Sequence, residues 1–173
     1  MDGLKLRHLV LTLALSTSMG AAFAATSNDF VDKAAAGGIA EVEASRLALE
    51  KSQSADIKAF ANMMITDHGK ANDELASIAK KNDIEVPDST TLVKQAKEKI
   101  LDMRDESFDA AYANNQVKAH EEAIKLFEKQ ANTVTDDQTK GATELKGFAQ
   151  QMLPGLQKHL DMAKKLQAAH PSK

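Results

Sequence analysis

The sequence predicts an all-α protein, an up-down four-helix bundle with one short additional crossing helix. Only three prolines and eight glycines occur in 173 residues, which is few for a protein rich in strands and turns. Alanine, lysine, glutamate and leucine, which are good helix formers, are abundant. Apolar residues recur with helical spacing in four long stretches and one shorter stretch, and short polar segments join these stretches.

The first 24 residues are predicted to be a signal peptide. Lys5 and Arg7 give a positively charged start, an apolar run of about 11 residues follows, and Ala22-Phe23-Ala24 is a small-x-small cleavage site. The run is shorter than the ~20 residues that span a bilayer, which disfavours the alternative of an uncleaved anchor. We therefore expect cleavage after Ala24, a periplasmic or secreted protein, and no transmembrane segment after cleavage. Because the chain has no cysteine, we expect neither a lipid anchor nor a disulfide.

Residues 25–169 are predicted to form one helical domain, followed by a disordered tail at 170–173. Ser27 or Asn28 can cap the first helix, and Pro87 marks the loop after the second. Pro154 lies inside the last helix, where a kink or a brief restart is expected. The expected helices span about residues 28–51, 55–82, 91–103, 106–131 and 143–168.

All three histidines of the helical body fall on apolar helix faces. At about 100° per residue, the inner faces of the helices expected at 55–82, 106–131 and 143–168 carry His68, His120 and His159 respectively. Glu41 lies on the inner face of the first helix, where a lone carboxylate needs a partner. One residue from each of four helices would then meet at mid-bundle. Counting residues from the loops places Glu41, His68 and His120 at nearly the same height along the bundle axis. The same count places His159 roughly 7 Å away from that height.

Three segments that carry these histidines, FANMMITDH, FDAAYANNQVKAH and MLPGLQKHL, with GGIAEVE upstream, resemble a known family. It is the secreted bacterial family catalogued as domain of unknown function 4142, and the resemblance runs from about residue 30 to 166. It implies a ferritin-like bundle and an exported protein, sometimes labelled an outer-membrane protein, and it implies no established activity. The positions that match are Glu41, Asp67, His68, Phe108, Asp109, Tyr112, His120, Pro154 and His159.

The four inward residues predict a candidate site for one transition-metal ion. Imidazole nitrogens suit zinc, copper, nickel and iron, and the carboxylate of Glu41 could complete a ligand set with the three histidines. Asp67 or Asp109 could orient a ligating histidine by accepting a hydrogen bond from its second nitrogen.

A ferritin-type di-iron centre is not expected. That centre requires Glu-x-x-His pairs, but Ile65, Val117 and Leu156 occupy the positions three residues before the histidines. The chain also lacks a cysteine, and no serine lies beside a histidine at helical spacing. We therefore expect no enzyme activity.

Two alternatives to a metal site stay open. In the first, the histidines are satisfied by Glu41, Asp67, Tyr112, Gln116 and backbone carbonyls, and this network fixes the packing of the helices. Buried neutral histidines take up protons on acidification, so such a bundle would loosen at about pH 5 to 6.

The second alternative is a partner-binding module of the cell envelope. The amphipathic helix at 91–103 could contact another protein, although a lid that closes one end of the bundle is the simpler reading. The formal net charge of −3 provides no basic field for nucleic acid. We expect a monomer or a weakly associating oligomer.

Overall fold

The computed structural model describes residues 28–101, 107–135, 139 and 141–172, so the expected signal peptide lies outside the described residues. All the regular elements in the described part of the chain are helices, as the sequence predicts. They are α1 (Asp29–Lys51), α2 (Ala55–Lys81), α3 (Ser89–Leu101), α4 (Phe108–Ala131) and α5 (Ala142–Ala169). The four-helix bundle with one shorter helix is therefore confirmed.

Two of the long helices, α1 and α4, begin at polar side chains that accept hydrogen bonds from their free N–H groups. Asn28 caps α1, because its side-chain oxygen accepts hydrogen bonds from the backbone N–H groups of Phe30 and Val31, both at 3.1 Å. Ser107 caps α4 by accepting from the N–H of Ala110. Before α5, Gly141 has a φ of 70°, a left-handed conformation that glycine adopts without steric cost.

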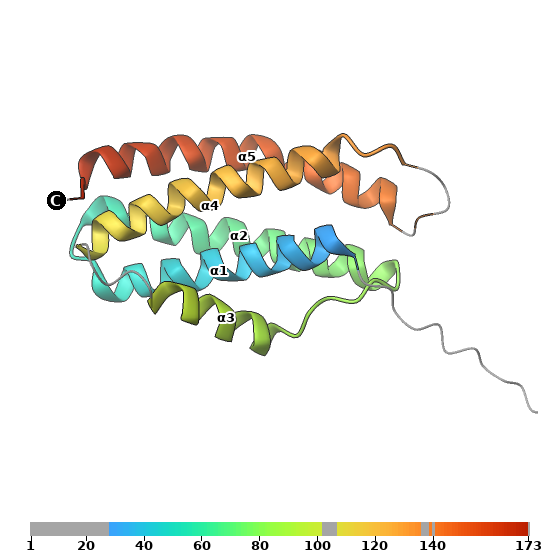
Figure 1. The fold of residues 1–173 in the computed structure, drawn as a ribbon, viewed down its shortest axis with the longest axis horizontal. Helices are drawn as coiled ribbons and strands as arrows, with labels where there is room; N and C mark the ends of the chain where they lie inside the picture. Colours follow the sequence, from blue (N-terminus) through green and yellow to red (C-terminus); the bar gives the residue numbers. More distant parts are fainter. Residues whose placement is uncertain (1–27, 102–106, 136–138, 140, 173) are drawn as a thin grey trace, which may run out of the picture.

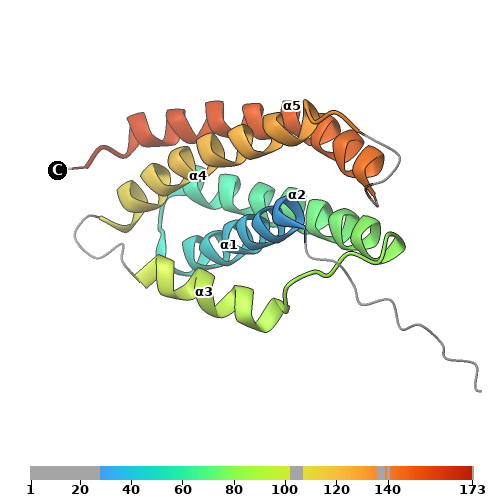
Figure 2. The same ribbon diagram turned by 45° about the vertical axis from the view of Figure 1, so that its right-hand side comes forward.

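The chain forms two helical hairpins that pack on each other. In Figure 1, α1 and α2 run in opposite directions, and so do α4 and α5. The helices α2 and α4, however, run in the same direction, so the segment between them returns along the length of the bundle (Figures 1 and 2). Helix direction thus alternates within each hairpin but not between α2 and α4. One long crossover joins the two hairpins, which is the connection used by ferritin-like bundles.

The short helix α3 forms part of this crossover. It packs against α1, and the side chains of Leu92 and Ala96 are buried there. Both views place α3 along the side of α1 instead of over one end of the bundle, where we expected a lid (Figures 1 and 2).

The core consists of two apolar clusters with a polar layer between them. The first cluster contains Phe30, Leu75, Phe127 and Leu156, among others. The second cluster lies further along each helix and contains Ala44, Met64, Tyr112 and Ala163, among others. Between the two clusters, each long helix contributes buried polar residues, which are Glu41, His68, Gln116, His120 and His159. The apolar clusters on both sides hold this layer at mid-bundle.

The last helix and the residues after it pack along the bundle. Pro154 lies inside α5, which continues through it and changes direction along its length (Figure 2). After α5, a ring nitrogen of His170 lies 3.0 Å from a carboxylate oxygen of Asp56, and the amide of Asn114 donates to Ser172. These contacts lie in the segment that the sequence suggested would be disordered. No described helix combines the length and the hydropathy needed to cross a membrane.

Candidate metal centre

Three buried imidazole rings meet in the polar layer. The ring centroids of His68, His120 and His159 lie 5.5 Å from one another in all three pairs. The side chains are nearly inaccessible, with exposed fractions of 7%, 1% and 4%. One potential ligand atom from each ring lies within 4.8 Å of those from the other two. The sequence prediction that the three residues meet at mid-bundle is therefore confirmed.

The hydrogen bonds of two rings fix which nitrogen carries the proton. Nδ1–H of His120 donates to the backbone carbonyl of Gln116 at 2.8 Å, because a carbonyl oxygen can only accept. Nε2–H of His159 donates to a carboxylate oxygen of Asp67 at 3.1 Å. In the neutral rings, the lone pairs are therefore on Nε2 of His120 and Nδ1 of His159. Both of these nitrogens, and Nε2 of His68, are buried and have no hydrogen-bond partner among the described residues.

Burial keeps the three rings neutral. Burial, together with the neighbouring His120 and His159, lowers the pKa of His68 to about 3. Burial also lowers the pKa of His120 to about 4, although the hydrogen bond to the Gln116 carbonyl acts in the opposite direction. The pKa of His159 is lowered by burial and partly restored by Asp67. Neutral imidazoles with free lone pairs are the form that binds metal ions.

Glu41 lies in the same layer but does not join the histidine cluster. No carboxylate oxygen among the described residues completes a set with all three histidine nitrogens at the 4.8 Å spacing. Burial raises the pKa of Glu41 to about 7, and the nearby Gln116 amide only partly offsets this effect. No hydrogen bond forms between the two side chains, and Oε2 of Glu41 is buried without a partner in the part of the chain that the structure describes. Glu41 is therefore a neighbour of the trio and not a fourth member of it.

The four residues expected to support the histidines have different roles in the structure. Asp67 does orient a histidine, but that histidine is His159 on another helix and not the adjacent His68. Gln116 supports His120 through its backbone carbonyl, while its own amide has no partner. Tyr112 instead shares a buried 2.9 Å hydrogen bond with Ser45. Asp109 lies in the first turn of α4, 11 residues before His120 and hence about 16 Å away along the helix.

The expected displacement of His159 along the bundle does not occur. Its ring lies as close to His68 and His120 as those two lie to each other. Counting residues from the loops fails here because α4 and α5 do not begin and end level with each other. The chain between Ala131 and Ala142 is long enough to shift one helix along the other.

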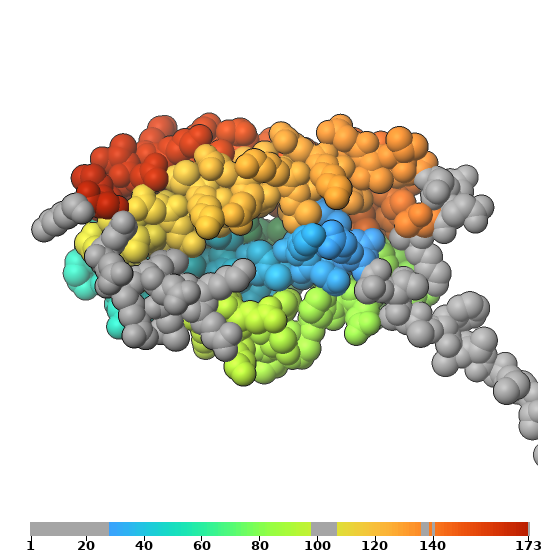
Figure 3. Space-filling model, in the orientation of Figure 1, coloured from blue at the N-terminus to red at the C-terminus, as the bar shows by residue number. Residues whose placement is uncertain are grey.

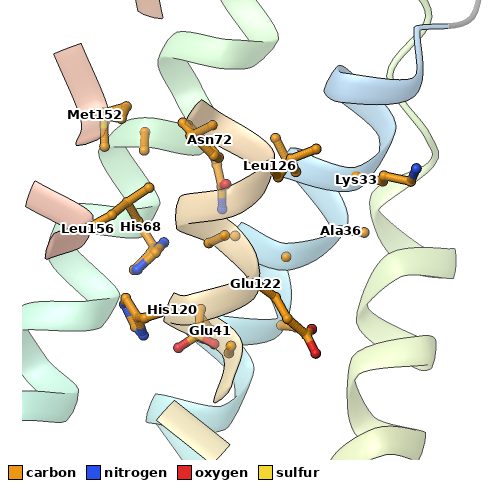
Figure 4. Close-up of a pocket in the computed structure, with 18 of the residues that line it drawn as sticks. Lys33, Ala36, Glu41, His68, Asn72, His120, Glu122, Leu126, Met152 and Leu156 are labelled. Atoms are coloured by element: carbon orange, nitrogen blue, oxygen red, sulfur yellow. The ribbon is translucent and has the colours of Figure 1, made fainter. Parts of the chain in front are cut away.

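A cavity of about 710 Å³ opens beside the trio. Figure 3 shows the corresponding hollow between α1 and α4. Small residues on the two facing helices, including Gly37, Ala40, Ala119 and Ala123, leave this space unfilled. His68, His120 and Glu41 are on its wall, and Figure 4 shows the Glu41 carboxylate turned toward the side where the His120 ring lies. His159 does not line the cavity.

Two features of the site were not predicted from the sequence. Ser45 is fully buried on α1, and its position four residues after Glu41 on the same inner face could have revealed it. The cavity follows from paired small residues on α1 and α4, and only the three-dimensional pairing of the helices shows that they face each other.

The fold and the site together define a helical bundle with a buried three-histidine centre. The chain belongs to the family described as domain of unknown function (DUF4142), whose model matches residues 12–166. No curated protein and no solved structure shows significant similarity to the chain.

Proposed function

We propose that the protein binds one transition-metal ion through Nε2 of His68, Nε2 of His120 and Nδ1 of His159. One observation carries this proposal. Each of three converging rings keeps a buried nitrogen without a hydrogen-bond partner, and the rings offer ligand atoms within 4.8 Å of one another. A metal ion between the rings would satisfy all three nitrogens at once.

The geometry requires only small movements for metal binding. Nitrogens bound to one tetrahedral ion at about 2.0–2.1 Å lie about 3.4 Å apart, so modest rotations of the rings would close the present spacing. Gln116 and Asp67 already hold the second nitrogens of His120 and His159, as partners of metal-bound histidines commonly do. Zinc suits three imidazoles with one position left open, and copper, nickel and iron also accept this donor type.

A purely structural hydrogen-bond network explains less of the site. It accounts for the hydrogen bonds of His120 and His159 and for the pair formed by Ser45 and Tyr112. It leaves three ring nitrogens and both amide atoms of Gln116 without partners, and buried unpaired polar groups are costly. A network that only stabilised the packing would satisfy these atoms. The metal hypothesis gives the three nitrogens a partner.

The metal content of the purified protein tests the proposal. The protein, prepared without a histidine tag, would be loaded with zinc and desalted, and zinc per chain would be measured by mass spectrometry of the elements. We expect about one zinc ion per chain in the wild type and almost none in His68→Ala and His120→Ala. His170→Ala is the matched control, because His170 contacts Asp56 outside the trio, and it should retain the zinc. Equal zinc content in the wild type and His68→Ala would rule out the site.

We also propose that the bundle acts outside the cytoplasm. The support is the signal-like segment of residues 1–24, with Lys5, Arg7 and the Ala22-Phe23-Ala24 cleavage site. When the full chain is produced in a bacterium, the protein of the envelope fraction should begin at Ala25. A protein that retains Met1 would contradict export by this route. We propose binding and assign no reaction.

A further inference from the structure

The proposed metal position is enclosed on one side and open on another. His68 and His120 both line the cavity, whereas His159 does not and is hydrogen-bonded to Asp67. An ion held by all three rings would therefore have one side directed toward the cavity. Three protein ligands and one open position are characteristic of zinc sites that bind exchangeable molecules.

A second polar group faces the same space. Glu41 lines the cavity, its exposed fraction is 6%, and its Oε2 has no hydrogen-bond partner. This oxygen accepts a hydrogen bond whether or not the carboxyl group is ionised, because a protonated carboxyl group keeps a carbonyl oxygen. A molecule that binds the ion from the cavity would therefore fit best if it also donated a hydrogen bond.

Part of the cavity wall is suited to an apolar body. Its wall includes Leu75, Leu126, Phe127, Phe148, Met152 and Leu156. Its volume of about 710 Å³ falls within the usual range for small-molecule sites. The cavity thus offers an apolar stretch of wall beside Glu41 and the two histidines, and the remaining polar residues of its lining are Lys33, Asn72, Asn115, Lys118 and Glu122.

We propose, on the basis of the metal site, that the open coordination position takes a small primary amine with an apolar body. The amine nitrogen donates its lone pair to the metal ion and an N–H to Oε2 of Glu41, and the apolar body fills the cavity. A carboxylate of the same size is a poorer ligand, because it has no proton to donate and places a second carboxylate beside Glu41.

Cobalt(II) provides the test, because its visible absorption spectrum reports both its binding and any change in its ligands. The cobalt-loaded protein would be titrated at pH 8 with benzylamine, methylamine and benzoate. We expect benzylamine to change the spectrum at a concentration at least about tenfold lower than either of the others. Glu41→Ala should keep the cobalt spectrum of the free site but weaken benzylamine binding by about tenfold.

A cavity-filling variant separates this ligand site from the surface. Ala123→Leu places a larger side chain on the cavity wall and should weaken benzylamine binding without releasing cobalt. Ala59→Leu, on the exposed face of α2, is the control and should bind benzylamine like the wild type. A cobalt spectrum that no amine changes would overturn the ligand proposal while leaving the metal site intact. Equal binding of benzoate and benzylamine, or of methylamine and benzylamine, would also overturn it. Failure to bind cobalt at all would instead contradict the metal site itself.

Discussion

His159 and Asp67 connect α5 to α2 through a hydrogen bond in which Nε2–H of the imidazole donates to the carboxylate over 3.1 Å. The two residues are 92 positions apart in the sequence. The bond fixes the ring so that Nδ1, with its lone pair, is left for the centre of the trio. The metal affinity of the site should therefore depend on a residue that does not touch the ion.

Replacing Asp67 should weaken metal binding without removing a ligand. We expect Asp67→Ala to lower zinc affinity by about 10- to 100-fold, and Asp67→Asn, which can still accept the hydrogen bond, to lower it less. Competition with a coloured chelator gives the dissociation constants. Asp73→Ala, an exposed change on the same helix, serves as the control. Unchanged affinity in Asp67→Ala would show that His159 does not ligate in the proposed orientation.

A substitution at His68 distinguishes the metal site from the structural network. Nε2 of His68 is buried without a partner, so His68→Leu replaces an unsatisfied polar group with an apolar one. We expect the metal-free variant to be as stable as the wild type, or more stable by about 1 kcal/mol, and to gain nothing from zinc. Urea unfolding with chelator and with zinc measures both effects. If His68→Leu were strongly destabilised without metal, the histidines would be holding the core together.

The stability of the metal-free protein should fall on acidification below about pH 6.5. Burial lowers the pKa of His68 to about 3 and that of His120 to about 4, and it also lowers the pKa of His159. Between those values and the ordinary value near 6.5, the unfolded chain binds protons that the folded chain excludes. Each such proton costs about 1.4 kcal/mol of unfolding free energy per pH unit.

Glu41 has the opposite effect on the pH dependence of stability, so a substitution at Glu41 tests the assignment of these pKa values. Its raised pKa of about 7 means that the folded state binds the extra proton between about pH 4.5 and 7, which adds stability as the pH falls. His68 and His120 together then leave a net loss of about 1.4 kcal/mol per pH unit near pH 5.5. Glu41→Gln removes the opposing effect and should steepen the loss by about 1.4 kcal/mol per pH unit. Urea unfolding with chelator at several pH values measures both slopes, and a variant slope no steeper than the wild-type slope would contradict the assignment.

Two adjacent glycines in α1 should respond differently to alanine. A Cβ at Gly37 meets nothing within 4 Å, whereas a Cβ at Gly38 would lie 2.0 Å from Oδ1 of Asn72. Gly37→Ala should therefore stabilise the protein by about 0.5–1 kcal/mol through helix propensity, as should Gly147→Ala in α5. Gly38→Ala should be less stable than Gly37→Ala, because the Asn72 side chain must move away.

A double-mutant cycle isolates that contact. In an Asn72→Ala background, Gly38→Ala should regain the stabilisation seen for Gly37→Ala. Thermal or urea unfolding measures all four proteins. If Gly38→Ala stays equally unfavourable without the Asn72 side chain, the close approach of α1 and α2 has a different cause.

The sequence predicted the parts of this protein that depend on one helix at a time. Helical periodicity identified the inner faces, and so Glu41, His68, His120 and His159 were expected at mid-bundle. Contacts between helices were less predictable, because they depend on rotation and axial shift. Asp67 therefore supports His159 instead of His68, Tyr112 pairs with Ser45, and Glu41 faces a cavity beside the trio.

The crossover between α2 and α4 was likewise predicted only in part. The loops and the amphipathic helix after Pro87 were recognisable, but the direction in which that segment travels was not. Its return along α1 makes α2 and α4 parallel (Figure 1). That direction depends on which apolar face of α1 packs against Leu92 and Ala96. The pattern of a single helix does not determine this tertiary contact.

A crystal structure of the zinc-loaded protein, with anomalous diffraction at the zinc edge, would show directly where the ion binds. The proposed metal site requires one strong anomalous peak between the rings of His68, His120 and His159, about 2.0–2.1 Å from Nε2, Nε2 and Nδ1 respectively. A peak only at an exposed pair such as His170 and Asp56, with the three buried rings unchanged, would contradict it.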